Sequence, residues 1–124
     1  RPVPTCRVGD WTPASGYAAG KAIAADRDVT AVFVGNDEMA LGLMLAFDEA
    51  GLRVPQDVSI VGFDDTPESA FLSPPLTTIH QDFTEVGRRS VEQLLALVDG
   101  QAQQQITLAP SLVVRKSTAA PRRR

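Results

Sequence analysis

Polar side chains follow two apolar runs of the sequence that are typical of strands. The run 31–35 leads into Asn36-Asp37-Glu38, and the run 58–63 leads into Asp64-Asp65-Thr66. If both runs are parallel strands of one sheet, these groups meet at one rim, where ligands of open parallel sheets bind. Amides and carboxylates without a neighbouring cation in the sequence suit neutral, hydroxyl-rich ligands such as sugars or nucleosides. The competing interpretation is that Asn36 caps a helix and Asp65 forms a turn.

The sequence offers no arrangement for catalysis. It contains no Gly-x-Ser-x-Gly nucleophile elbow, no Gly-x-x-x-x-Gly-Lys phosphate loop and no Gly-x-Gly-x-x-Gly fingerprint. Asp64 and Asp65 are adjacent and therefore point apart, which does not suit a shared Mg²⁺. His80 has no second His and no nearby Cys with which to complete a zinc site. We therefore predict no catalytic residue, no metal site and no cofactor.

Two apolar features allow both a functional and a structural interpretation. Trp11, the only tryptophan, could stack on the C–H face of a sugar or could pack in the core. The helix that bears Leu41, Met44 and Leu45 is apolar on all sides, which indicates burial under the sheet, under a partner subunit, or under both.

Helices and strands alternate in the first half of the sequence, as they do in α/β proteins. Thr12-Pro13 begins a helix that runs to about Ala25, and Asn36 caps a second helix that ends at Ala50, before Gly51. The β-branched runs 31–35 and 58–63 are typical of strands that are buried on both faces of a parallel sheet. Strand, helix and strand in this order predict a parallel βαβ unit.

The second half of the sequence combines short extended stretches with one long helix. Residues 64–75 contain three prolines and are predicted to form a loop, which leads into extended residues 76–79. Apolar residues at helical spacing predict a helix from residue 83 or 84 to residue 99, closed by Gly100. Brief strands are expected at 106–108 and 112–114, and the arginines at 122–124 are interpreted as a frayed end.

Length and composition set the class of protein. The chain has 124 residues, of which 44% are hydrophobic and 22% charged, as expected of one globular domain. No apolar run reaches the roughly 18 residues that span a bilayer, and the single Cys6 excludes an internal disulfide. The terminal arginines contribute +3 to a net charge of −3, which leaves −6 on a body poorly suited to nucleic acid. Because the sequence opens with Arg1 rather than Met, we interpret it as a piece of a longer protein.

Four motifs resemble the C-terminal part of lac-repressor-type (LacI/GalR) bacterial transcription regulators. They are NDEMALG at 36–42, GLRVPQDVSIVGFDDT at 51–66, PPLTTIHQDF at 74–83 and LVVRKST at 112–118. The resemblance implies an α/β fold: a doubly wound, parallel-sheet lobe of the periplasmic-binding-protein-like (type I) fold, incomplete at its N-terminus. It further implies a lobe core over residues 6–80, a crossover helix segment over 81–105, and C-terminal strands and tail over 106–124.

The same resemblance implies a function and a set of site residues. The chain is expected to be the effector-sensing and dimerisation region of a cytoplasmic, sugar-responsive repressor, with the DNA-binding headpiece absent. Residues matching the family's ligand contacts are Trp11, Asn36, Asp64, Gln81 and Phe83. Residues matching its dimer surface are Leu41, Leu45, Phe71 and Leu72. We further expect Asp64 to accept hydrogen bonds from the ligand, and Asp65 to cap the turn into Thr66.

The implied partners are a sugar or nucleoside effector, a second copy of the chain, and operator DNA through the missing headpiece only. No membrane partner is expected. The alternative function is that of a periplasmic sugar-binding protein in a transport system, because such proteins share the fold.

Overall fold

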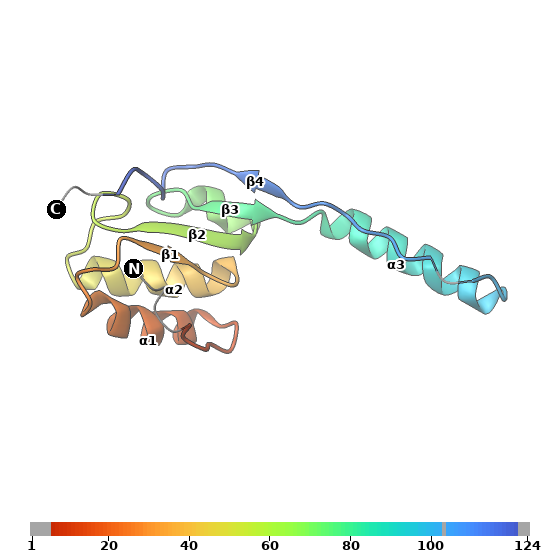
Figure 1. Ribbon diagram of the computed structural model, residues 1–124, viewed down its shortest axis with the longest axis horizontal. Coiled ribbons are helices and arrows are strands. Elements are labelled where there is room, and N and C mark those ends of the chain that lie inside the picture. Colours follow the sequence, from red (N-terminus) through yellow and green to blue (C-terminus); the bar gives the residue numbers. More distant parts are fainter. Residues whose placement is uncertain (1–5, 103, 122–124) are drawn as a thin grey trace.

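The computed structural model describes residues 6–102 and 104–121, which form an α/β body and a projecting helical arm (Figure 1). The elements in chain order are α1 (Pro13–Ala24), β1 (Ala31–Phe33), α2 (Asp37–Glu49), β2 (Ser59–Asp64), the 3-10 helix η1 (Pro67–Phe71), β3 (Thr77–His80), α3 (Phe83–Val98) and β4 (Ser111–Val113). The expected order of helices and strands is confirmed up to the end of α3. The predicted loop 64–75 differs in that it contains η1, and the expectation for 122–124 lies outside the described residues.

The strands form one sheet in the order β1-β2-β3-β4. β1, β2 and β3 are parallel, and β4 pairs with β3 in the antiparallel direction. The parallel βαβ unit and the strand at 112–114 are thus confirmed. The strand expected at 106–108 is wrong: this stretch runs back along α3, where the backbone N–H of Gln104 donates to the side chain of Gln93, and no strand lies beside it among the described residues.

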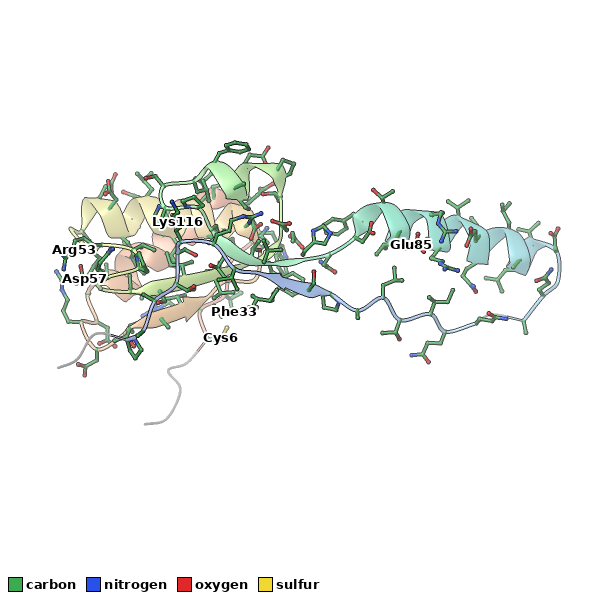
Figure 2. All side chains as sticks on the ribbon, turned by 90° about the horizontal axis from the view of Figure 1, so that it is seen from above. Cys6, Phe33, Arg53, Asp57, Glu85 and Lys116 are labelled. Carbon is green, nitrogen blue, oxygen red and sulfur yellow. The ribbon has the colours of Figure 1, made fainter. Side chains whose placement is uncertain are left out.

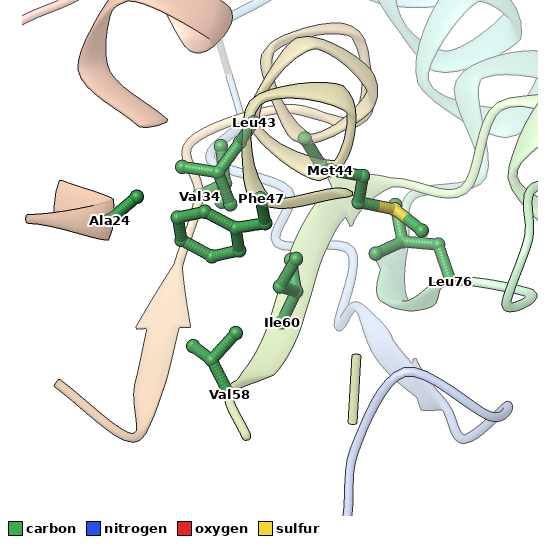
Figure 3. Packing of buried hydrophobic residues seen from close by; sticks show 9 residues of the cluster. Ala24, Val34, Leu43, Met44, Phe47, Val58, Ile60 and Leu76 are labelled. Atoms are coloured by element: carbon green, nitrogen blue, oxygen red, sulfur yellow. The ribbon is translucent and has the colours of Figure 1, made fainter. Parts of the chain in front are cut away.

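Helix α2 packs on one face of the sheet, and α1 packs against α2 (Figure 1). The core between them contains Leu43, Phe47, Ile60 and Leu76, all buried (Figure 3). The two helices approach closely because Gly42 lies against the first turn of α1: a Cβ atom there would come 1.8 Å from the carbonyl oxygen of Pro13. Burial of these apolar side chains is the main source of stability in the body.

The helix ends follow the capping signals in the sequence. The side chains of Thr12, Asn36 and Asp82 accept hydrogen bonds from backbone N–H groups in the first turns of α1, α2 and α3. Gly51 and Gly100 follow the C-terminal ends of α2 and α3 with φ of 71° and 75°, a conformation that glycine adopts at little cost.

The opposite face of the sheet is less covered, which contradicts the expectation that the strands are buried on both faces. Ile60 and Gly62 of β2 are buried on the α2 side, whereas Val61 and Phe63 on the other side are only half-buried. Phe33 of β1 (Figure 2) is 65% exposed. Its ring meets the ring of Phe63 edge to face, with centroids 6.4 Å apart. β1 is one of the two edge strands of the described sheet, and its apolar composition did not indicate this.

Helix α3 leaves the body at the end of β3 and projects away from it (Figures 1 and 2). All residues of α3 are described, and none of them is buried. Arg88 and Arg89 bond to Glu85 and approach Glu92 along one side of the helix. Among the helices that the structure describes, none combines the length and apolarity needed to cross a membrane.

Candidate ligand-binding site

The carboxyl ends of the three parallel strands bring the predicted polar residues to one edge of the sheet. Phe33 pairs in register with Val61, so Asn36 and Asp64 each lie three residues beyond a paired position. Asp64 in turn pairs with His80, and Gln81 follows directly. Asn36, Asp64 and Gln81 therefore sit on adjacent segments at the same edge, which is where open parallel sheets bind their ligands.

Asn36 connects this edge to Trp11. The Oδ1 atom of Asn36 accepts a hydrogen bond from the backbone N–H of Met39 at 2.9 Å, which confirms the helix-cap interpretation. Its Nδ2 group donates to the carbonyl oxygen of Trp11 at 3.0 Å. Trp11 has a φ of 70° and its side chain is 64% exposed, so the core-packing interpretation of this residue is wrong. An indole ring held in the open can stack on an apolar ligand face.

Asp64 and Gln81 contact each other directly. The side-chain Nε2 group of Gln81 donates to Oδ1 of Asp64 at 2.9 Å. Both residues are half-buried, and the φ of Asp64 is 110°, a left-handed backbone conformation that residues with a Cβ rarely adopt. Phe83, two residues after Gln81, begins α3 with an exposed ring. Together they give the edge a carboxylate, an amide and an aromatic face.

Asp65 does not cap the turn into Thr66, contrary to the sequence-based expectation. Its carboxylate accepts from the guanidinium of Arg115 at 2.6 Å and lies 3.1 Å from Nδ1 of His80. The backbone N–H of Thr66 donates instead to Asp37 at 3.0 Å. Arg115 follows β4, fifty positions after Asp65, so its pairing could not be predicted from sequence proximity.

Asp37 does not belong to the ligand-facing rim on which the sequence pattern placed it. Its side chain turns inward and is buried, with hydrogen bonds from Thr66, Ser69 and Thr78. No role was predicted from the sequence for Arg115, Ser69 or Thr78, although Thr78 and Arg115 lie within the motifs quoted above. A hydroxyl residue carries no local signal that it will meet a carboxylate from another element.

Two cavities of the body lie away from this edge. Two cavities of about 370 and 340 Å³ lie against α1 and near the C-terminal end of α2, and Trp11, Asn36, Asp64 and Gln81 line neither of them. Among the described residues, no group of three or more His, Cys, Asp or Glu side chains could hold a metal ion. Acceptors, amides and an exposed indole are the groups that recognise neutral hydroxylated ligands.

The residues assigned to a dimer surface are divided between exposed and partly buried positions. Leu41 and Leu45, one turn apart on α2, are both about half exposed, and Phe71 at the end of η1 is almost fully exposed. Leu72 instead packs against the core as a partly buried residue. Three of the four side chains are therefore available to a partner.

Known proteins match this chain along almost its whole length. The model of the periplasmic binding protein-like domain matches residues 3–118. The lactose operon repressor of Escherichia coli strain K12 is 50% identical over 117 residues, which cover 93% of this chain and 32% of the repressor. A solved dimeric lac repressor with a C-terminal deletion superposes with a TM-score of 0.85 at 47% identity, covering 92% of this chain and 43% of that structure.

A third relative is a LacI family transcriptional regulator from Arthrobacter sp. FB24, solved in complex with lactose. It is 34% identical with a TM-score of 0.79, and the match covers 90% of this chain and 44% of that one. The chain thus spans about a third of the curated repressor and under half of these solved chains. By family model, sequence identity and fold, the chain belongs to the LacI family of transcriptional regulators, within their periplasmic binding protein-like domain.

Proposed function

We propose that this chain is part of the effector-sensing and dimerisation core of a bacterial, sugar-responsive transcriptional repressor that acts in the cytoplasm. Operator DNA would be bound through a headpiece outside this chain. The observation that carries the proposal is the Asp64–Gln81 contact at the strand ends, together with the exposed Trp11, which Asn36 connects to the same edge. The alternative, a periplasmic sugar-binding protein of a transport system, is not favoured, because the relatives described above are transcription regulators.

The effector in this proposal is a neutral, hydroxylated molecule, a sugar or a nucleoside. Asp64 would accept hydrogen bonds from ligand hydroxyls, Asn36 and Gln81 would supply amide groups, and Trp11 and Phe83 would offer apolar surfaces. The lactose complex of the Arthrobacter regulator supports a sugar. An effector of this kind would change operator affinity only through different affinities for two conformations of the core.

The test is the substitution Asp64→Ala in the full-length regulator that contains this segment. A hydrogen bond to a charged group contributes about 1.5 to 3 kcal/mol, so the effector affinity should fall roughly 10- to 150-fold. Operator affinity would be measured with and without lactose and a panel of neutral sugars and nucleosides. Without effector it should be unchanged, because the substitution touches neither the headpiece nor the dimer surface.

Asp99→Ala is the matched control, since Asp99 is an exposed carboxylate at the far end of α3. An Asp64→Ala protein that responds to effector like the wild type would exclude Asp64 as a ligand contact. Loss of operator binding without effector would show instead that Asp64 is structural.

Dimerisation is proposed to use Leu41, Leu45 and Phe71. Leu41→Asp would place a charge in the middle of this apolar surface, where it would remain desolvated in a dimer. Sedimentation of the 124-residue chain should therefore show a lower mean mass for Leu41→Asp than for the wild type at equal concentration. Ala22→Asp, on the exposed side of α1, should sediment like the wild type. A wild-type chain that stays monomeric at high concentration would refute the assignment.

A further inference from the structure

The carboxylate of Asp37 lies inside the protein and has three hydrogen-bond donors. The side chain belongs to the first turn of α2, and the residue is only 2% exposed. Oδ2 accepts from the backbone N–H of Thr66 at 3.0 Å and from the hydroxyl of Ser69 at 2.5 Å. Oδ1 accepts from the hydroxyl of Thr78 at 2.6 Å. All three donors are neutral. The carboxylate of Asp37 is therefore held by hydrogen bonds and not by an ion pair with any of these groups.

These donors come from the segments that carry the candidate ligand contacts. Thr66 follows Asp64 by two residues, and Thr78 precedes Gln81 by three on β3. Asp37 itself directly follows Asn36. One buried carboxylate therefore joins the start of α2, the turn after β2 and the strand that leads to Gln81, although it does not face the ligand edge.

The turn after β2 has a strained backbone conformation that must be held by contacts with other segments. Asp64 and Asp65 have φ values of 110° and 57°, both in the left-handed region. The N–H group of Thr66, the first after this pair, is the group that Asp37 binds. Gly62 leaves room for the carboxylate, because a Cβ atom at Gly62 would lie 2.2 Å from Oδ1 of Asp37. Strand, turn and helix thus fit around this one side chain.

We propose that Asp37 is a positioning residue of the candidate site, which holds the Asp64 turn and the end of β3 against α2 and so sets the Asp64–Gln81 contact. The inference rests on the proposed function only in that Asp64 and Gln81 are there named as ligand contacts. Asp37 acts through its neighbours, because its own oxygens are buried and bonded.

The experiment is hydrogen exchange and NMR of the 124-residue chain with Asp37→Asn, an almost isosteric change that removes the charge. Exchange of the Thr66 amide should accelerate about 10- to 150-fold, the equivalent of one lost charge-assisted hydrogen bond. The amide of Ile60, bonded to the carbonyl of Ser117 at 2.8 Å in the core, reports global opening. Thr66 should accelerate more than Ile60, and the side-chain amide signal of Gln81 should shift.

Two further variants keep the result interpretable. Thr78→Val removes one donor to Oδ1 without changing the charge, so it should shift the Gln81 signal less, and it remains available if Asp37→Asn does not fold. Asp99→Asn removes an exposed carboxylate and should change neither the exchange of the Thr66 amide nor the side-chain amide signal of Gln81. Equal acceleration at Thr66 and Ile60, or an unmoved Gln81 signal in both Asp37→Asn and Thr78→Val, would overturn the proposal and leave Asp37 as a purely structural residue.

The measurement uses no sugar and no DNA. Its outcome is therefore independent of the Asp64→Ala operator experiment. If Asp64→Ala leaves the effector response intact while Thr66 and Gln81 respond to Asp37→Asn, the positioning contact stands and the assigned ligand role of Asp64 fails.

Discussion

Helices α2 and α3 both begin at an Asn or Asp cap with an acidic residue in the first turn, yet their environments are opposite. Seven residues of α2 are buried between the sheet and α1, while none of the residues of α3, all of them described, is buried. Their apolar residues are arranged differently as well. In α2 they surround the helix, whereas in α3 they are separated from a charged side that carries Arg88 and Arg89.

A periodic apolar stripe therefore specifies a helix but not the surface that covers it. α3 has the regular pattern of an amphipathic helix, and its start and end were predicted within one residue. Its leucines and valines are nevertheless exposed in this chain. Stability in this molecule should therefore depend on α2 and very little on α3, and substitutions matched between the two helices can test this.

The largest expected difference is between two leucine truncations. Leu43 of α2 is 2% exposed and Leu94 of α3 is 61% exposed. Leu43→Ala removes buried methyl groups and leaves a cavity, so it should lower the free energy of unfolding by about 2 to 5 kcal/mol. Leu94→Ala should change it by no more than about 0.5 kcal/mol. Urea denaturation of both variants checks the prediction, and equal losses would mean that α3 packs on something in solution.

Substitution of alanine for two glycines, one in α2 and one in α3, should change stability by less than the leucine truncations do. One substitution should lower stability and the other should raise it. A Cβ atom at Gly42 would meet the Pro13 carbonyl at 1.8 Å, whereas nothing lies within 4 Å of the corresponding position at Gly87. Gly42→Ala should push α1 and α2 apart and destabilise the body by about 1 to 3 kcal/mol or more. Gly87→Ala should raise helix stability by up to about 1 kcal/mol. Thermal unfolding, together with the helical circular dichroism signal, distinguishes the two; stabilisation by Gly42→Ala would show that the helices do not cross so closely.

The sequence predicted those parts of the fold that depend on neighbouring residues. The Asn36 cap, the Gly51 and Gly100 stops and the βαβ order are local signals, and all were confirmed. The burial of β1 on both faces was not, because Phe33 depends on what lies across the sheet. The strand expected at 106–108 failed for a similar reason, since a strand needs a partner that composition cannot name.

In the candidate site as well, features that depend on neighbouring residues were predicted and features that depend on distant residues were not. Asp64 could be placed at the rim because it ends a strand. Gln81 was named only through the family resemblance, and its contact with Asp64 was not predicted. Asp65 was misassigned because its partner, Arg115, arrives from beyond β4. The inward turn of Asp37 depends on hydroxyl groups of two other elements and on the bare backbone of Gly62. Contacts between segments that are distant in the sequence could not be predicted from the local residue pattern.

The smallest expected effect is an acid-induced loosening of α3. Arg88 and Arg89 bond to Glu85 and lower the pKa of its carboxyl group from 4.5 to about 2. A pKa that is lower in the folded state means that the contact stabilises the helix fully above pH 4.5 and is lost as the pH falls towards 2. The α3 amide signals of the chain should therefore broaden or shift over this interval, as followed by NMR. Those of the core residues Leu43 and Ile60 should respond less to this contact, because the Glu85 cluster lies on the projecting arm.

Glu85→Gln separates this contact from other acid effects. It removes the titrating group, so α3 should already be looser at neutral pH and should change less between pH 4.5 and 2. High salt should weaken the contact in the wild type as well, because exposed ion pairs are screened. If the α3 signals of the wild type and of Glu85→Gln respond to acid equally, the arginine contacts do not hold the helix. Its order would then come from backbone propensity alone, and the contrast with the tightly packed α2 would be greater still.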